Sequence, residues 1–123
     1  MYAIQTILSK ARENLHAARL CQREKHYNAT ANRAYYACAQ AAFAILIQHH
    51  KTPAKPSHDS VYREFLGVYS QSSSKLPKIL SSLRTHRETA DYTDININPR
   101  QALDCIIAAN DFVSQLLQYL KRK

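Results

Sequence analysis

The sequence predicts an all-α protein, an up-and-down bundle of four long helices and one shorter helix. Its 123 residues include one glycine and four prolines, which leaves little of the turn chemistry that an all-β fold requires. Apolar residues recur at steps of three and four along most of the chain, as a buried helical face requires. Hydrophobic residues make up 46% of the sequence, so we expect one domain with a single core over residues 1–123.

Residues 3–23 form the first predicted helix. Apolar side chains recur in this segment at alternating steps of four and three, and charged residues occupy the opposite side. A short polar connection, residues 22–27, comes next, so we expect the first two helices to be antiparallel neighbours. The predicted buried stripe consists of Ile4, Leu8, Ala11, Leu15 and Ala18, with Ile7 widening it.

The rest of the bundle is predicted to be organised around residues 28–48, an alanine-rich stretch without Gly, Pro or Asp. Alanine has the highest helix propensity, and its small side chain lets neighbouring helices approach closely. We therefore expect a central helix with other helices packed on most of its sides. It should end near His49 and His50, because Pro53 and Pro56 interrupt the next segment. Its predicted buried face comprises Ala31, Ala34, Tyr35, Cys38, Ala41, Ala42 and Ile45.

A short third helix is predicted to begin after the prolines, with Ser57 as its N-cap. Residues 70–75, rich in serine, are predicted to form a mobile turn. The buried side of this helix is predicted to contain Val61, Phe65 and Val68, with Tyr62, Leu66 and Tyr69 available to widen it.

Two longer helices complete the predicted bundle. The first begins at Leu76 and Pro77, because proline is well tolerated in a first turn. Residues 93–98 form a connection, after which Asn98 and Pro99 supply an N-cap and a proline at the first helical position. The stripe of the last helix consists of Ala102, Ile106, Ala109, Val113, Leu116 and Leu120, and the helix closes with the basic residues 121–123.

The net charge indicates the chemical class of the binding partner, and the cysteine content indicates the cellular compartment. The formal net charge of +8 suggests an anionic partner, whether RNA, a nucleotide or an acidic protein. The three cysteines are far apart and lie within predicted helices, so we expect free buried thiols and a reducing cytoplasm. No apolar run is long enough to cross a membrane, and the start of the chain lacks the layout of a signal peptide.

The fourth predicted helix carries a charged residue where its apolar pattern calls for a hydrophobic one. Asp91 follows this residue, Arg87, at the spacing of a helical ion pair, and Arg84 lies on the same face. One interpretation is an internal ion pair that fixes helix register, or an arginine that reaches the edge of the bundle. The other is a phosphate-binding arginine in a cleft between helices, since the guanidinium fork suits phosphate. The seam in question runs through Leu76, Leu80, Leu83, Arg87 and Ala90.

The central helix offers a second candidate site at Arg33. Two adjacent tyrosines, Tyr35 and Tyr36, follow it, and they point in different directions on a helix, so at least one belongs to the core. The other can present its hydroxyl beside Arg33, on the face that also carries Gln40. Asn32 immediately precedes Arg33.

The histidines give weaker indications. His58 is at the start of the third predicted helix, and the sequence alone favours a solvated side chain there. The same holds for His49 and His50 near a helix C-terminus, where positive charge is favourable. No carboxylate or cysteine lies at ligand spacing near them, so we expect neither a metal site nor a cofactor. The sequence contains no Gly-rich phosphate loop, nucleophile signature or HExxH.

Three segments together resemble the HEPN-domain family, in particular its small single-domain branch. They are Asn32-Arg33-Ala34-Tyr35-Tyr36-Ala37 on the central helix, Ser57-His58, and Arg87-Glu88-Thr89-Ala90-Asp91-Tyr92 on the fourth. The resemblance covers nearly the whole chain. It implies a helical bundle that forms a homodimer, with a positively charged cleft at or near the dimer interface. It also implies a minimal nucleotidyltransferase as a partner encoded nearby, in a toxin–antitoxin or defence pair.

One departure from the family pattern bears on catalysis. HEPN ribonucleases, which cleave RNA without metal, carry an arginine followed after four to six residues by a histidine, on the helix that corresponds to residues 76–92. Here Asp91 and Tyr92 stand in that window, and His86 precedes Arg87 instead of following it. Metal-independent cleavage needs a base, an acid and a positively charged group that stabilises the phosphorane. Arg87 can supply the charge, and His58, or Tyr92 and Tyr36, would have to supply the rest.

Three hypotheses therefore stay open at the level of sequence. The protein is an RNA-binding or RNA-cleaving HEPN toxin, a non-catalytic HEPN subunit that binds a nucleotide or docks a nucleotidyltransferase, or a helical interaction module. Tyr92 is also a candidate for attachment of a nucleotide by the partner. The candidate catalytic residues are Arg87, His58 and Asp91, and the candidate RNA- or nucleotide-binding residues are Asn32, Arg33, Tyr36, Arg84 and Tyr92.

Overall fold

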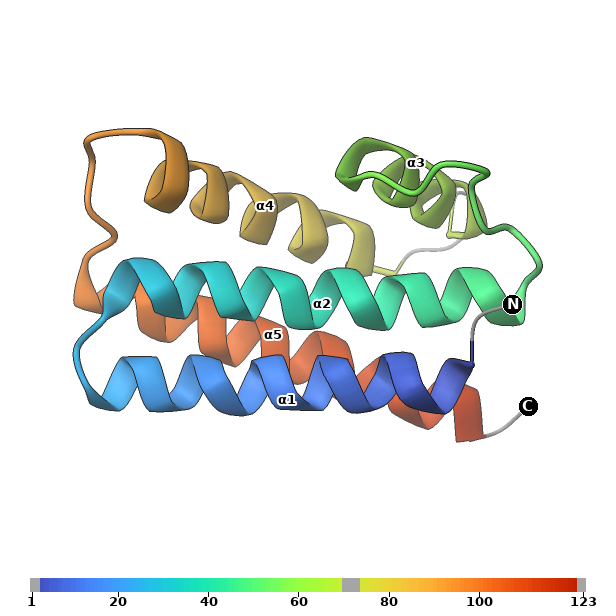
Figure 1. The fold of residues 1–123 in the computed structure, drawn as a ribbon, viewed down its shortest axis with the longest axis horizontal. Helices are drawn as coiled ribbons and strands as arrows, with labels where there is room; N and C mark the ends of the chain where they lie inside the picture. Colours follow the sequence, from blue (N-terminus) through green and yellow to red (C-terminus); the bar gives the residue numbers. More distant parts are fainter. Residues whose placement is uncertain (1–2, 70–73, 122–123) are drawn as a thin grey trace.

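The computed structural model describes residues 3–69 and 74–121, and these form the predicted all-α bundle, with five helices and no strand. Figure 1 shows that α1, α2, α4 and α5 run alternately up and down, whereas α3 lies above the second half of α2. The start of α1 and the end of α5 therefore lie at the same end of the bundle. The helices are α1 (Ile4–Arg23), α2 (Tyr27–Gln48), α3 (His58–Val68), α4 (Leu76–Tyr92) and α5 (Pro99–Lys121).

Helix α2 is the centre of the bundle, as its alanine content predicts. It packs against each of the other four helices. Small side chains bring the neighbouring backbones close, and every residue of the predicted face is buried. The alanines that are fully buried on α2 are Ala31, Ala34, Ala37, Ala41, Ala42 and Ala44.

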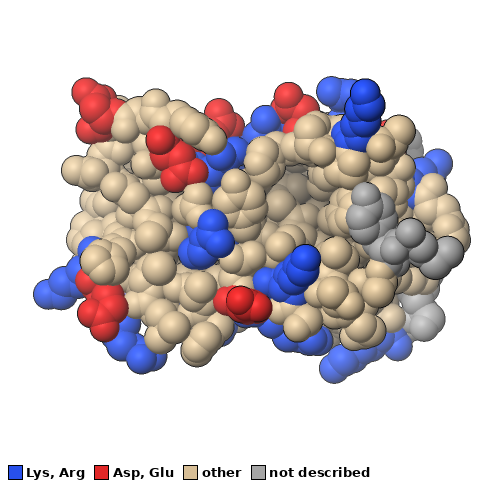
Figure 2. All heavy atoms as spheres, viewed as in Figure 1, with Lys and Arg blue, Asp and Glu red and all other residues tan. Residues whose placement is uncertain are grey.

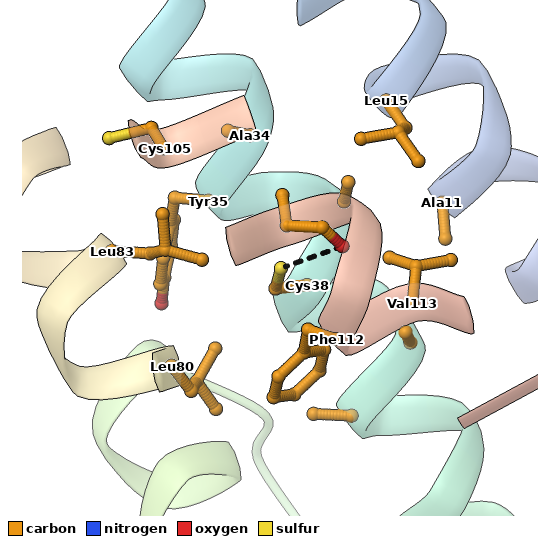
Figure 3. Packing of buried hydrophobic residues seen from close by; sticks show 14 of the residues in the cluster. Ala11, Leu15, Ala34, Tyr35, Cys38, Leu80, Leu83, Cys105, Phe112 and Val113 are labelled. Carbon is orange, nitrogen blue, oxygen red and sulfur yellow. Dashed lines mark hydrogen bonds between the residues drawn. The ribbon is translucent and has the colours of Figure 1, made fainter. Parts of the chain in front are cut away.

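The core lies where α2 meets α4 and α5. Figure 3 shows Tyr35 directed towards Leu80 and Leu83 of α4, and the Cys38 thiol directed towards a backbone carbonyl oxygen of α5. The Cys38 thiol lies 3.9 Å from the carbonyl oxygen of Ala109, the group to which it can donate. Burial raises the pKa of this thiol well above its ordinary value, so it behaves as a small apolar group.

All three cysteines are free thiols, but the expectation that all are buried is wrong for one of them. Cys38 and Cys105 are buried, whereas Cys21 is only half-buried. Cys21 lies in the last turn of α1.

The helix boundaries follow local chemistry. The Ser57 hydroxyl accepts a hydrogen bond from the Ser60 backbone N–H at 3.1 Å and caps α3, as predicted. The Asn98 side chain accepts from the Gln101 N–H at 2.8 Å at the start of α5, which confirms the second predicted cap. Helix α2 begins at Tyr27, one residue earlier than predicted, and has no side-chain cap.

Helix α3 is attached less deeply than its pattern predicts. Only Phe65 is fully buried, and Val61 and Val68 are half-buried. Leu66 does not widen the buried side, because it is 44% exposed. The helix lies against α2 and α4 and reaches α5 through Phe65, so one narrow stripe is covered. Of the predicted 70–75 turn, residues 70–73 lie outside the described residues, as do the last two of the basic residues 121–123.

The last helix shows a small rotation of its predicted stripe. Ala102, Ala109, Val113 and Leu116 are buried as expected, whereas Ile106 and Leu120 are only partly buried. Cys105 and Phe112 are buried in addition. Within the described ranges, none of the helices combines the length and apolar character needed to span a membrane.

Phe65 is expected to be the residue that holds α3 on the bundle. Its ring contacts Tyr69 of α3 and Phe112 of α5, with centroid separations of 4.9 and 5.6 Å. Phe65→Ala should lower the free energy of unfolding by about 3–5 kcal/mol, measured by urea denaturation. The adjacent exposed Leu66→Ala should change it by no more than about 0.5 kcal/mol. Equal losses for the two variants would contradict this account of α3.

Candidate functional site

Arg87 is the centre of a polar cluster where α2, α3 and α4 meet. It occupies the apolar seam of α4 and is 4% exposed. Its guanidinium carbon lies 5.3 Å from the ring centroid of Tyr35, 5.8 Å from that of Tyr36 and 5.3 Å from that of Tyr92. Aromatic faces attract a cation without neutralising it. The two candidate sites, the arginine on α4 and the tyrosine pair on α2, thus lie in one place.

The ion pair predicted for Arg87 is present but long. Its Nη1 lies 3.7 Å from Asp91 Oδ2, and the same oxygen accepts a 2.7 Å hydrogen bond from the side chain of Asn32. Nη1 also donates to the Tyr92 hydroxyl at 3.2 Å. The Nε atom of Arg87 is buried and has no hydrogen-bond partner among the described residues. Its carboxylate pairing is therefore incomplete.

The charge of Arg87 nevertheless persists. Burial lowers the pKa of this guanidinium, but the hydrogen bond to Tyr92 and the oxygens of the neighbouring tyrosines raise it by more. The net shift of the pKa is upward, so the side chain stays protonated in the folded protein.

Arg33 also lies against Tyr36, with its guanidinium carbon 5.0 Å from the ring centroid. Its hydrogen bonds go to amide oxygens: Nε donates to Asn32 at 2.8 Å, and Nη1 donates to Asn14 of α1 at 3.0 Å. Asn14 in turn donates to Gln40 at 2.7 Å. Amide oxygens satisfy the N–H groups but leave the positive charge in place.

His58, at the first position of α3, belongs to the same cluster. Its Nδ1 lies 2.9 Å from the Tyr35 hydroxyl oxygen, and its ring is tilted against both Tyr35 and Tyr36. Burial lowers the pKa of His58 below its ordinary 6.5, and the charges of Arg87 and Arg84 lower it further. The imidazole is therefore neutral at pH 7. The sequence-based interpretation of His58 as a solvated residue is wrong, because the first turn of α3 packs against α2.

Arg84 is held differently from the other two arginines. It pairs with Asp59 of α3 at 2.5 Å and with Glu88 at 3.3 Å, so two carboxylates face its charge. The hydrogen bond from Arg84 lowers the pKa of the Asp59 carboxyl. Arg84 thus ties α4 to the start of α3, next to His58.

The surface is hollowed where α2, α3 and α4 meet (Figure 2). A pocket of about 370 Å³ is lined by residues of α1, α2 and α3 and of the segment before α3, and its walls include the side chains of Tyr35 and His58. In Figure 2, positively and negatively charged side chains surround the hollow. The arginines of the cluster are matched in number by Asp59, Glu88 and Asp91, so the chain's net charge of +8 does not by itself make this hollow strongly basic.

All eight predicted site residues lie in or beside this cluster. The structure adds residues that were not among those eight, namely Tyr35, Asp59, Glu88, Asn14 and Gln40. Asn14 comes from α1 and Gln40 from a later turn of α2, and together they orient Arg33. The sequence placed Gln40 on the face of Arg33, but nothing in it connected Asn14 to that face. The only signal was an asparagine within the polar side of an otherwise regular amphipathic helix.

The second histidine expectation also needs correction. His49 is not merely solvated: its Nε2 lies 2.8 Å from the Tyr119 hydroxyl, and the two rings are stacked. This pair joins the end of α2 to the end of α5, away from the Arg87 cluster. In the ranges 3–69 and 74–121, no three His, Cys, Asp or Glu side chains converge as metal ligands would.

Comparison with known proteins places this chain in one family. The sequence model of the HEPN domain matches residues 4–119, which run from the start of α1 almost to the end of α5. The chain belongs to the HEPN domain family. A protein of Methanocaldococcus jannaschii named "Putative toxin MJ0605" is 32% identical over 122 residues, covering 96% of this chain and 89% of that protein. The resemblance carried by the motifs around Arg33 and Arg87 is confirmed.

The titration of His58 is expected to report the charge of Arg87. In the wild type, His58 binds a proton less readily in the folded state than in the unfolded state, because its folded pKa lies below 6.5. Its contribution to stability is therefore lost as the pH falls from 6.5 through the folded pKa. In Arg87→Met, NMR titration should give a higher pKa for His58, still below 6.5 because burial remains. The exposed Arg100→Gln should leave the titration unchanged. An unaltered His58 pKa in Arg87→Met would contradict the geometry of the cluster.

Proposed function

We propose that this HEPN protein is the toxin component of a toxin–antitoxin or defence-type pair and binds RNA or a nucleotide through a phosphate at Arg33 and Arg87. The observation that carries this proposal is that both guanidinium groups flank Tyr36 while lacking full carboxylate pairing. Phosphate oxygens accept the bidentate hydrogen bonds that a guanidinium offers. The name of the Methanocaldococcus relative supports the toxin role.

The surroundings of the two arginines also suit nucleic acid. Tyr92 is 74% exposed beside Arg87, and half-buried Tyr36 has both guanidinium groups near its ring. Bases of single-stranded RNA stack on such rings, and arginine contacts the backbone. Asn32 positions both Asp91 and Arg33, because its side chain donates a hydrogen bond to Asp91 and accepts one from Arg33.

We further propose that bound RNA is cleaved without metal. Neutral His58 is available to accept the proton of a 2′-hydroxyl, whose oxygen then attacks the phosphorus and displaces the 5′-oxygen. Arg87 stabilises the charge of the phosphorane, and Asp91 holds Arg87 in place through the long ion pair. A water or tyrosine hydroxyl protonates the leaving oxygen. Arg84 sets the position of His58 through Asp59.

A second candidate function is favoured by a different observation. Asp91 and Tyr92 occupy the window in which HEPN ribonucleases carry histidine, and the Tyr92 side chain is exposed. These features suit a non-catalytic subunit that binds a nucleotide, or docks a minimal nucleotidyltransferase encoded nearby. A homodimer, as the family resemblance implies, would place two such clusters in one assembly.

RNA binding and cleavage can be tested with one set of variants. Total cellular RNA incubated with the protein in the presence of EDTA should be cleaved by the wild type and at least about 100-fold more slowly by His58→Ala. Arg33→Gln should weaken binding of a fluorescent RNA about tenfold, because a charged hydrogen-bond partner of phosphate is lost. Arg100→Gln, an exposed charge on α5, is the matched control.

The outcomes separate the two candidate functions. RNA bound through Arg33 but left intact would establish the non-catalytic subunit. RNA bound equally by the wild type and Arg33→Gln would contradict the phosphate site. Arg87→Met keeps roughly the volume of the buried side chain. It should weaken RNA binding as Arg33→Gln does and slow RNA cleavage as His58→Ala does. Circular dichroism of each variant checks that the bundle is intact.

Tyr92 provides a test of the second candidate. Its exposed ring and its hydroxyl, which accepts from Arg87, form a reachable nucleophile for a nucleotidyltransferase. Co-expression with the neighbouring nucleotidyltransferase should add the mass of one or more nucleotidyl groups, and Tyr92→Phe should remove it. Tyr62→Phe serves as the control, since that tyrosine lies on α3 outside the cluster. An unmodified wild-type protein would exclude this role.

A further inference from the structure

The pocket between α1, α2 and α3 has walls of two kinds. Most of its surface is apolar, whereas the groups nearest the arginine cluster are polar. Its volume of about 370 Å³ falls in the ~300–1,000 Å³ range of small-molecule sites. The apolar wall comprises Ile7, Ala39, Phe43, Pro56 and Val61, and the polar groups are Tyr35, Gln40, Ser57 and His58.

The hydrogen-bond network fixes which way the Gln40 amide points. Arg33 can only donate, so the Asn14 atom that it contacts must be the oxygen. The other end of the Asn14 amide is then the NH₂ group, which donates to Gln40 at 2.7 Å. The oxygen of Gln40 is thereby used, and its NH₂ group is the part of the amide left for a ligand. Arg33 at the phosphate site thus orients a donor at the wall of the pocket.

We infer that this pocket holds the nucleobase of the RNA or nucleotide whose phosphate binds at Arg33 and Arg87. The inference rests on the proposed function and adds the part of the ligand that determines specificity. Tyr35 and His58 line the pocket and also belong to the arginine cluster, so the two sites are continuous. Asn14 connects them a second time, since it contacts both Arg33 and Gln40.

A nucleobase matches both kinds of wall. Its flat faces can be buried against the apolar side chains, while its carbonyl oxygens or ring nitrogens accept from the Gln40 NH₂ group. A purely apolar ligand would leave that donor unsatisfied, at a cost of about 1–3 kcal/mol. A bare phosphate or a sugar phosphate would leave the apolar wall in contact with water. The sugar and phosphate then extend from the pocket towards the two arginines.

Calorimetric titration with AMP, UMP and ribose 5-phosphate tests this inference on the full chain. The wild type should bind at least one of the two nucleotides about tenfold more tightly than ribose 5-phosphate, because the base adds stacking and a hydrogen bond. Ala39→Leu fills the pocket and should reduce nucleotide affinity to that of ribose 5-phosphate, whose own affinity stays within about twofold. Ala29→Leu, an exposed position on the same helix, is the matched control.

A second variant keeps the test independent of how Ala39→Leu folds. Gln40→Glu retains an oxygen for Asn14 but replaces the NH₂ donor, so the preference for nucleotide over ribose 5-phosphate should fall about tenfold. Equal wild-type affinity for the nucleotides and ribose 5-phosphate would overturn the base pocket while leaving the phosphate site intact. A nucleotide preference that survives both variants would also overturn it.

Failure of the proposed function gives a different result. If ribose 5-phosphate does not bind but adenosine or uridine binds the wild type and not Ala39→Leu, the base pocket stands and the phosphate site at Arg33 and Arg87 is wrong. If none of these five ligands binds the wild type, both proposals are overturned.

Discussion

The burial of one positive charge is the constraint on which this bundle depends. A guanidinium removed from water is costly unless polar or aromatic groups surround it. Arg87 meets this condition through rings contributed by two helices and through the long contact with Asp91. Because Tyr35 must reach it from α2, the depth and register of α2 against α4 are fixed together. The alanines of α2 let the helix axes come close enough for that contact.

Most of the fold was predictable because it depends on local spacing. The apolar stripes gave every helix to within a residue or so at its start, and the caps at Ser57 and Asn98 are set by side chains within three positions. The slot occupied by Arg87 was also visible, since a charge at an apolar position breaks the pattern. The prediction was weakest for α3, whose short stripe did not reveal that Leu66 would face outward.

The assembly of the site was less predictable, because its decisive contacts join positions far apart in the chain. Asn32 and Asp91 are 59 positions apart, Tyr35 and His58 are 23 apart, and Asn14 and Gln40 are 26 apart. Periodicity specifies which face of a helix is buried, but not which neighbour covers it or how far that neighbour is rotated. His58 was misjudged for this reason: the first turn of a helix is solvated only if no other helix covers it.

The three arginines of the cluster show how the choice of partner determines what a charge can do. Arg84 is paired with two carboxylates, one of them on α3, and it therefore ties α4 to α3. Arg33 is held by amide oxygens, and Arg87 mainly by tyrosine rings, and neither kind of partner cancels a charge. Burial keeps His58 neutral by lowering its pKa, and the charges of Arg87 and Arg84 lower that pKa further. An arginine that is held in place but not neutralised can bind an anion at little further cost in side-chain entropy. For this reason we propose the phosphate site at Arg33 and Arg87, and not at Arg84.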